Sequence, residues 1–226
     1  MTEPIRIAHF SDILCIWAYI GQIRLTQLQE TFSTQVVFDY HFVEIFGNTQ
    51  EKLTKRWQAR GGLAAYNQHV LSVAAKFDHI QVHPEIWTKD IPPSSTACHL
   101  FLHAIKLLEQ NALIDSTANL YAQAIWRCRE AFFIDLANIS QRSVLLAIAE
   151  DLKLPIAAIE SEINSGAAFA QLVENLDRVK DYGVSVSPTL IFNEGRQRLS
   201  GNVGYRVIQA NVQELLHNPP GELSWC

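Results

Sequence analysis

The opening of the chain constrains its fold more than any other segment. The stretch "IRIAHF" (5–10) alternates apolar and polar residues, as a half-buried strand does. Apolar residues then recur at the spacing of one helical face, at Ile16, Tyr19, Ile20 and Ile23. "QVVFDYHFVEIF" (35–46) is rich in β-branched and aromatic residues and predicts a second strand. Since β-α-β crossovers are right-handed and join parallel strands, the sequence predicts a parallel β-α-β unit over residues 5–46.

The pattern changes after this unit. Helical spacing dominates with little strand signal, in segments 50–77, 96–110, 116–133, 140–152 and 155–180, interrupted by a Pro-rich linker at 83–95. Strand character returns in "PTLIFN" (188–193), followed by a turn and the short strand "RQRLS" (196–200). A last helix is expected over 205–217. The predicted order is therefore β-α-β, a block of helices, then β-β-α.

Composition limits the classes of function. The 226 residues are 48% hydrophobic and 18% charged, as in a soluble globular protein. A net charge of -5 argues against a nucleic-acid surface, and the short basic stretch "KLTKRWQAR" (52–60) is expected to be a solvated helix face. No apolar run approaches the roughly 20 residues that span a bilayer. No secretory signal precedes the first strand, so we expect a cytoplasmic protein without membrane association.

The chain has four cysteines, Cys15, Cys98, Cys128 and Cys226, and no C-x-x-C pair. This excludes a zinc ribbon and a local dithiol centre, and in a cytoplasmic setting the thiols should be reduced. Cys98 and Cys128 lie in the middle of predicted helices, where we expect packing roles. His99 and His103 are four residues apart, but the apolar stripe of their helix lies opposite them and no third ligand has a suitable spacing. We expect these histidines to be solvated and predict no metal site.

Cys15 is placed where the first strand gives way to the first helix. A thiolate is the reactive form of cysteine, and unpaired amides at a helix N-terminus lower the thiol pKa. Trp17 and Tyr19 are candidates for an apolar platform beside it. The alternative is a buried, inert cysteine at a structural joint. The position by itself leaves both interpretations open.

Three segments of the sequence resemble the DsbA-like branch of the thioredoxin superfamily, in particular its FrnE-like, kappa-glutathione-transferase-like and 2-hydroxychromene-2-carboxylate-isomerase-like members. "SDILCIWAYIG" (11–21) is similar to that branch's S-D-x-x-C-P-W-C-Y-x-G segment, with Cys15 at the nucleophile position. "DYGVSVSPTLIFN" (181–193) resembles its segment with a cis-proline, here Pro188. "LSGNVGYRVIQANVQELL" (199–216) resembles its last strand-to-helix segment, and 124–154 resembles its helical insertion more weakly.

The resemblance implies an α/β fold, a thioredoxin fold with a large all-helical domain inserted after the second strand. The thioredoxin-like domain would comprise 1–46 and 183–226, and the helical domain 47–182. It also implies that Pro188 is cis and faces Cys15, and that the backbone of Ser187 is offered to a bound peptide or glutathione. Cys15 is then the catalytic residue, and the binding residues implied are Ser11, Trp17, Ala18, Tyr19, Ser187, Pro188, Gly201 and Asn202.

The chain departs from that family pattern at two positions, Ile16 and Ala18, because C-P-W-C is replaced by C-I-W-A. Cys15 can still form a mixed disulfide, but no neighbouring thiol can resolve it, so an external thiol such as glutathione must do so. The first hypothesis is therefore a monothiol thiol-disulfide oxidoreductase or isomerase without a permanently bound cofactor. The alternatives are a glutathione transferase or glutathione-dependent isomerase, in which Ser11 or Cys15 stabilises a bound thiolate, and a non-catalytic peptide-binding module.

The partners expected under these hypotheses are a small thiol or a disulfide-containing peptide or protein. The resemblance to transferases and isomerases also implies that the protein can form a homodimer. The sequence leaves open whether Cys98 or Cys128 can reach Cys15 as a distant resolving thiol.

Overall fold

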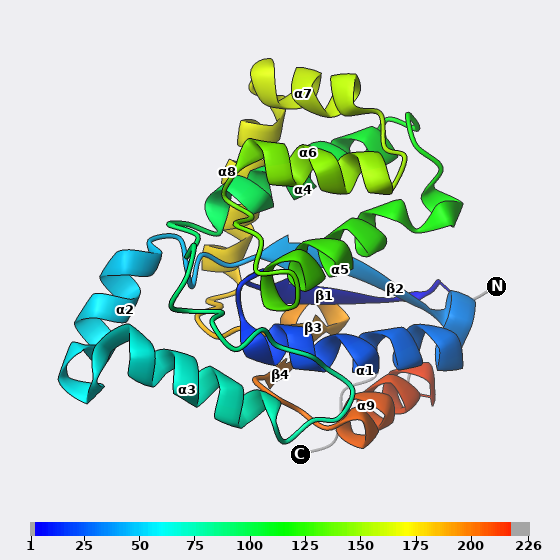
Figure 1. Ribbon diagram of the computed structural model, residues 1–226. Coiled ribbons are helices and arrows are strands. Elements are labelled where there is room, and N and C mark those ends of the chain that lie inside the picture. The colour runs from blue at the N-terminus through cyan, green and yellow to red at the C-terminus, as the bar shows by residue number, and fades with distance from the viewer. Residues whose placement is uncertain (1–2, 218–226) are drawn as a thin grey trace.

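A computed structural model describes residues 3–217 and shows a mixed four-stranded sheet with helices on both faces (Figure 1). The elements are β1 (Ile5–Ser11), α1 (Ile16–Phe32), β2 (Val36–Phe42), α2 (Thr49–Trp57), α3 (Gly62–Ala74), α4 (Thr96–Gln110), α5 (Leu120–Phe133), α6 (Arg142–Asp151), α7 (Ile156–Asn164), α8 (Ala167–Asp181), β3 (Thr189–Phe192), β4 (Gln197–Ser200) and α9 (Tyr205–His217). The seven helices α2 to α8 stand between β2 and β3. The predicted thioredoxin fold with a helical insertion is confirmed, and the domain limits at 46/47 and 182/183 stay a prediction.

The strand order is β2-β1-β3-β4, with β1 and β2 parallel and the other two pairs antiparallel. Alternate residues of β1 point to opposite faces of the sheet. Ile7 packs with residues of α1 and α9, whereas Phe10 packs on the other face with Val184 and Ile191. In Figure 1, α1 and α9 lie below the sheet and α5 lies above it. The sheet is therefore the middle layer of a three-layer arrangement.

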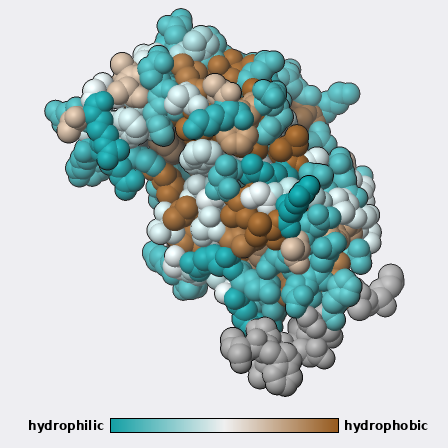
Figure 2. Space-filling model, turned by 90° about the horizontal axis from the view of Figure 1, so that it is seen from below, coloured by the Kyte–Doolittle hydropathy of each residue, from teal (hydrophilic) through white to brown (hydrophobic). Residues whose placement is uncertain are grey.

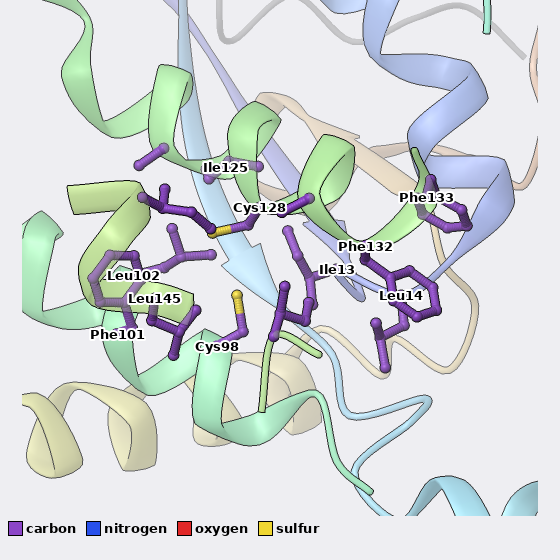
Figure 3. Packing of buried hydrophobic residues seen from close by; sticks show 14 of the residues in the cluster. Ile13, Leu14, Cys98, Phe101, Leu102, Ile125, Cys128, Phe132, Phe133 and Leu145 are labelled. Atoms are coloured by element: carbon purple, nitrogen blue, oxygen red, sulfur yellow. The ribbon is translucent and has the colours of Figure 1, made fainter. Parts of the chain in front are cut away.

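The helices of the insertion form a core of their own that reaches back to the first helix. It contains Ile13, Leu14 and Tyr19 from the start of α1 and the turn before it, together with buried residues of α4, α5 and α6. Figure 3 shows this packing, with Cys98 of α4 and Cys128 of α5 directed into the same apolar region. The turn that carries Cys15 is thus held between the sheet and the helical core.

Two predicted helical segments are each divided in the structure. Segment 50–77 contains α2 and α3, separated at Gly61 and Gly62, whose φ angles are +103° and +68°. Segment 155–180 contains α7 and α8, separated at Gly166 with φ +88°. Glycine adopts positive φ without the steric cost that other residues meet, so these glycines supply the breaks. The second strand also ends earlier than predicted, at Phe42 instead of Phe46.

Three expectations about exposure were wrong. Ile23, placed in the apolar stripe of α1, is 47% exposed, and it is one of the large hydrophobic residues on the surface. His99 and His103 are buried, with 0% and 2% exposed. The reason is that α4 is covered on both sides: α5, α6 and α7 pack on it together with α8, and both histidine rings contact Phe42 of β2.

The face seen from below in Figure 2 has hydrophobic side chains gathered near its middle, with hydrophilic side chains around them. Val207 of α9 is 53% exposed, and α9 is the lowest labelled helix of Figure 1. Within residues 3–217, none of the helices combines the length and apolar character needed to cross a bilayer. Cys226 lies outside the described residues.

Candidate active site

Cys15 is the N-cap residue of α1, with an extended backbone (φ -82°, ψ 116°). Its carbonyl oxygen accepts hydrogen bonds from the N–H groups of Ala18 and Tyr19, each at 3.0 Å. Its thiol donates to the carbonyl oxygen of Ser187 at 3.3 Å. Only 7% of the residue is exposed. The structure therefore places the sulfur at the start of a helix, close to the surface but almost covered.

The segment before β3 is tied to the Cys15 turn at two points. Besides the thiol contact, the hydroxyl oxygen of Ser187 accepts from the N–H of Asp12 at 2.9 Å. The Ser187–Pro188 peptide bond is cis, and both residues are buried. The N–H of Gly201 donates to the carbonyl oxygen of Pro188 at 2.8 Å. Residues 172 positions apart in the chain, Cys15 and Ser187, thus meet directly.

Ala18, Pro188 and Gly201 also line one small cavity of about 20 Å³. This volume is about what one water molecule needs. Asn202 is exposed beside it and its side-chain oxygen accepts a hydrogen bond from Arg24. Ala18 itself is 2% exposed, so the methyl group at this position is packed against neighbouring residues.

Ser11, Trp17 and Tyr19 are placed differently from the expectation that all three face a ligand. Ser11 is 1% exposed, and its hydroxyl is held by a buried arginine of α5. Tyr19 is 2% exposed and its ring stacks on Phe133, with ring centroids 4.7 Å apart. Trp17 is half-buried and meets Phe77 edge-on. Of these three residues, Trp17 alone keeps a side chain that a bound molecule can reach.

Asp12 is the functional candidate that the sequence analysis missed. Its carboxylate is fully buried and accepts hydrogen bonds from Leu14 N–H at 2.9 Å, Phe46 N–H at 2.7 Å and the Ser95 hydroxyl at 3.0 Å. Burial raises the pKa of Asp12 to about 6, although these hydrogen bonds act in the opposite direction. The sequence did contain a signal for this residue, because Asp12 directly follows the first strand and precedes Cys15 by three residues.

Burial also raises the pKa of the Cys15 thiol. Hydrogen bonding with Ser187 and with the amides of Ala18 and Trp17 lowers this pKa, and the negative charge of Asp12 raises it. The expected effect of the helix N-terminus is thus present, but desolvation outweighs it. Burial therefore favours the protonated form of the Cys15 thiol in the free protein.

Lys52 of α2 brings a cation near the site. Its ammonium group lies 3.8 Å from the centre of the Phe46 ring, and the residue is half-buried. Burial lowers the pKa of Lys52, and the charges of Asp12 and Cys15 raise it. The sequence analysis expected residues 52–60 to form a solvated helix face. Lys52 departs from this expectation because it is half-buried next to the site.

Cys98 and Cys128 are both 0% exposed, and the Cys128 thiol is close enough to affect the pKa of Cys98. Burial raises the pKa of Cys98 well above its usual value. Both side chains lie in the apolar packing between α4 and α5, as Figure 3 shows. This environment agrees with the packing roles expected for them. Among residues 3–217, no three histidine, cysteine or carboxylate side chains gather as metal ligands would.

A larger groove, of about 1000 Å³, runs along β2 between α1 and α5. Its lining includes Gln22, Tyr40 and Trp126 but not Cys15. The groove is therefore separate from the thiol.

Comparison with known proteins identifies the family. The family model described as "DSBA-like thioredoxin domain" matches residues 6–213. Among curated proteins, the ClpXP adapter protein SpxH of Bacillus subtilis is 29% identical over 104 residues, which are 43% of this chain and 34% of that protein. The match thus spans about a third of the length of this relative.

Solved structures resemble the whole chain. A protein of Nitrosomonas europaea superposes with a TM-score of 0.75 at 15% identity, over 96% of this chain and 100% of that one. The cytosolic disulfide reductase DsbM from Pseudomonas aeruginosa gives 0.66 at 16% identity, over 93% and 99%. A 2-hydroxychromene-2-carboxylate isomerase gives 0.66 at 14% identity, over 94% and 96%. At such identities these likenesses establish the fold alone.

Proposed function

Because the chain belongs to the DSBA-like thioredoxin domain family, we propose that it catalyses thiol-disulfide exchange through the single cysteine Cys15. One observation carries the proposal. The Cys15 thiol lies at a helix N-terminus and contacts the carbonyl of Ser187, the residue before cis-Pro188, while a methyl group stands at Ala18. The nucleophile and the segment facing it are both present, and a second thiol in the motif is absent.

The exchange takes place in two steps. The Cys15 thiol loses its proton, and the thiolate attacks one sulfur of a substrate disulfide. The substrate S–S bond breaks, a mixed disulfide with Cys15 forms, and the leaving thiolate takes up a proton. A thiolate from outside the protein, for which we propose glutathione, then attacks the substrate sulfur. It forms a new disulfide with that sulfur and releases Cys15 as thiolate, so no net oxidation of the protein occurs.

Asp12 is suited to assist proton movement in the first step. Its pKa of about 6 leaves the carboxylate mostly ionised at pH 7, and its charge is close enough to affect the Cys15 pKa. Its three hydrogen bonds fix its orientation beneath the turn. The carboxylate can therefore receive a proton without rearranging.

A reducing compartment would supply the external thiol, and we accordingly propose a cytoplasmic location. The fold neighbour DsbM is described as a cytosolic disulfide reductase, which supports this assignment. The substrates proposed are disulfides of small thiols, peptides or proteins.

The experiment is mass spectrometry of the protein after incubation with glutathione disulfide at pH 8. We expect one glutathionyl group on the peptide that contains Cys15, and its removal by added glutathione. Cys15→Ser should form no adduct, and Cys98→Ser should behave as the unsubstituted protein. An unmodified Cys15, or an adduct that glutathione cannot remove, would contradict the proposal.

Ala18→Cys provides a second arm, because it restores a C-x-x-C pair. A disulfide between Cys15 and the introduced thiol should then form, and disulfide reduction should become less dependent on glutathione. If this variant is oxidised by neither glutathione disulfide nor a small aromatic disulfide, the turn does not support exchange chemistry.

A second candidate is peptide binding without catalysis. Burial of Cys15, which raises its thiol pKa, favours it, and SpxH is described as an adapter protein. Partner capture that is unchanged in Cys15→Ser would support this alternative. The glutathione transferase or isomerase hypothesis would be supported if glutathione protected Cys15 from alkylation without forming an adduct. In that case Cys15, and not the buried Ser11, would face the bound thiol.

A further inference from the structure

The core next to the active site contains a cation without a carboxylate partner. Arg129 of α5 is 0% exposed. One guanidinium nitrogen, Nη2, donates to the Ser11 hydroxyl at 2.8 Å, and Nη1 donates to the side-chain oxygen of Gln22. Both acceptors are neutral, and no ion pair involves Arg129 within residues 3–217. Buried charges in proteins are normally paired, so this arrangement requires an explanation.

The position of Arg129 is fixed by its neighbours on α5. Trp126 and Phe133, three residues before and four residues after it, both stack on the Tyr19 ring in the first turn of α1. The face of α5 that carries Arg129 is therefore packed on the start of α1. Its two acceptors flank Cys15 in the chain: Ser11 ends β1 four residues before it, and Gln22 lies seven residues after it.

We infer that Arg129 is a positioning residue for the exchange reaction, whose buried charge stabilises the thiolate of Cys15 when the first step forms it. This inference rests on the function proposed above. In the thiol form the site holds a buried cation with neutral ligands. The ionised Asp12 carboxylate acts on Arg129 electrostatically without forming an ion pair with it. Loss of the Cys15 proton adds a further negative charge that interacts with Arg129 in this buried region, where the attraction between opposite charges is strong.

The electrostatics support this geometry. Burial lowers the pKa of Arg129 to about 10, and among the charges that raise it Cys15 comes first, before Tyr40 and Asp12. Coupling between two sites is reciprocal, so an anionic Cys15 that favours protonated Arg129 is itself favoured by it. Hydrogen bonds with Ser187 and with the amides of Ala18 and Trp17 are the leading influences that lower the Cys15 pKa, and the contribution of Arg129 is the quantity that its substitution measures.

Other ionisable groups also face Cys15 and must stay constant in a test. They are Asp12 in the preceding turn, Lys52 of α2 and Tyr66 of α3, each of which interacts electrostatically with Cys15. His99 of α4 lies 3.9 Å from the Asp12 carboxylate. The substitutions proposed below change only Arg129 or its hydrogen-bond acceptor Gln22, so these four ionisable groups stay in place.

The test is the pH dependence of Cys15 alkylation by iodoacetamide, followed by mass spectrometry on folded full-length protein. Arg129→Gln removes the charge and keeps a side chain that can hydrogen-bond to Ser11. We expect the apparent pKa of Cys15 to rise, so that alkylation at pH 7.5 slows by about tenfold. Arg129→Lys retains a cation and should restore most of the rate.

Two controls separate charge from packing. Gln22→Met removes one hydrogen bond of Arg129 but not its charge, and should leave the alkylation profile near that of the unsubstituted protein. Arg127→Gln removes an exposed cation of the same helix and should also have little effect. An unchanged profile in Arg129→Gln, or an equal shift in Gln22→Met, would overturn the inference.

If Arg129→Gln does not fold, Gln22→Glu takes its place. A carboxylate at this position pairs with Arg129 and neutralises the buried cation, so alkylation of Cys15 should slow while the Gln22→Met rate stays normal. Equal alkylation rates in Gln22→Glu and Gln22→Met would overturn the inference.

Alkylation reports the thiolate without any disulfide substrate. If the unsubstituted protein forms no mixed disulfide with glutathione disulfide, the proposed function fails, whereas the dependence of alkylation on Arg129 is still measured. The two outcomes are therefore distinguishable.

Discussion

Acidification from pH 7 to pH 5 should remove much of the stability of this protein, because three histidines are buried in their neutral form. His9, His99 and His103 are at most 2% exposed, and burial is the largest cause that lowers the pKa of each to about 3. The unfolded chain binds a proton at each histidine near pH 6.5, whereas the folded chain does not. Stability is therefore lost progressively as the pH falls from 6.5 toward 3.

The magnitude follows from these pKa values. Between pH 7 and pH 5 each histidine should reduce the free energy of unfolding by about 2 kcal/mol, or about 6 kcal/mol together. Asp12 acts in the opposite direction: its folded pKa is raised to about 6, so protonation regains about 1 kcal/mol over the same interval. The net loss of about 5 kcal/mol is comparable with the whole stability of many domains.

His103→Leu tests the origin of this loss. Neither ring nitrogen of His103 has a hydrogen-bond partner in the described part of the chain, so an apolar side chain should be tolerated at pH 7. The variant should lose about 2 kcal/mol less than the unsubstituted protein between pH 7 and pH 5. Urea unfolding, followed by circular dichroism at both pH values, measures the difference.

The exposed His69 offers a matched control. His69→Leu removes an imidazole from a residue that is exposed in the folded protein, so it shows how much of the effect of His103→Leu comes from losing any histidine rather than a buried one. If His103→Leu loses as much stability on acidification as the unsubstituted protein, the histidines do not titrate as their burial requires and the reasoning is refuted.

Three further substitutions have expected outcomes. Asn175→Ala should cost about 2–4 kcal/mol in urea unfolding, because the Asn175 amide satisfies both the N–H and the carbonyl of Phe42, and a cost below about 1 kcal/mol would contradict this. Ser95→Ala should raise the Asp12 pKa above about 6, measured by carboxyl NMR titration, and an unchanged value would contradict the role of that hydrogen bond. Phe133→Ala should lower the free energy of unfolding by about 3–5 kcal/mol, because the ring is fully buried and its removal leaves a cavity. Equilibrium unfolding measures this loss, and a value well below about 3 kcal/mol would mean that neighbouring side chains fill the cavity.

The histidines show how a helical wheel can mislead. Of the apolar stripe predicted for α4, Phe101, Ala104 and Leu108 are buried, whereas Ala97 and Leu100 are half-buried. The wheel carries no information about a second partner, however, and α4 is packed on the opposite side as well, where both histidine rings contact Phe42. A neutral imidazole can be buried there at a cost that surrounding apolar contacts outweigh.

Local patterns in the sequence determined the element types and their order. Strand alternation, helical spacing and the strand-to-helix joint at Cys15 depend on residues near one another in the chain, and the helix over 96–110 was predicted with the bounds that α4 has. The absence of a C-x-x-C pair was equally readable from the sequence, and the family resemblance indicated that Ala18 stands where the second cysteine would be.

Only the tertiary structure decided the protonation of the site and the partners of its charges. Asp12 meets Ser95, Cys15 meets Ser187, and Arg129 meets Ser11 across separations of 83 to 172 residues. Sequence spacing cannot give such contacts. The direction of the Cys15 pKa depends on desolvation, which requires knowing what covers the sulfur. Whether a helix terminus activates a cysteine is thus decided by the packing around it.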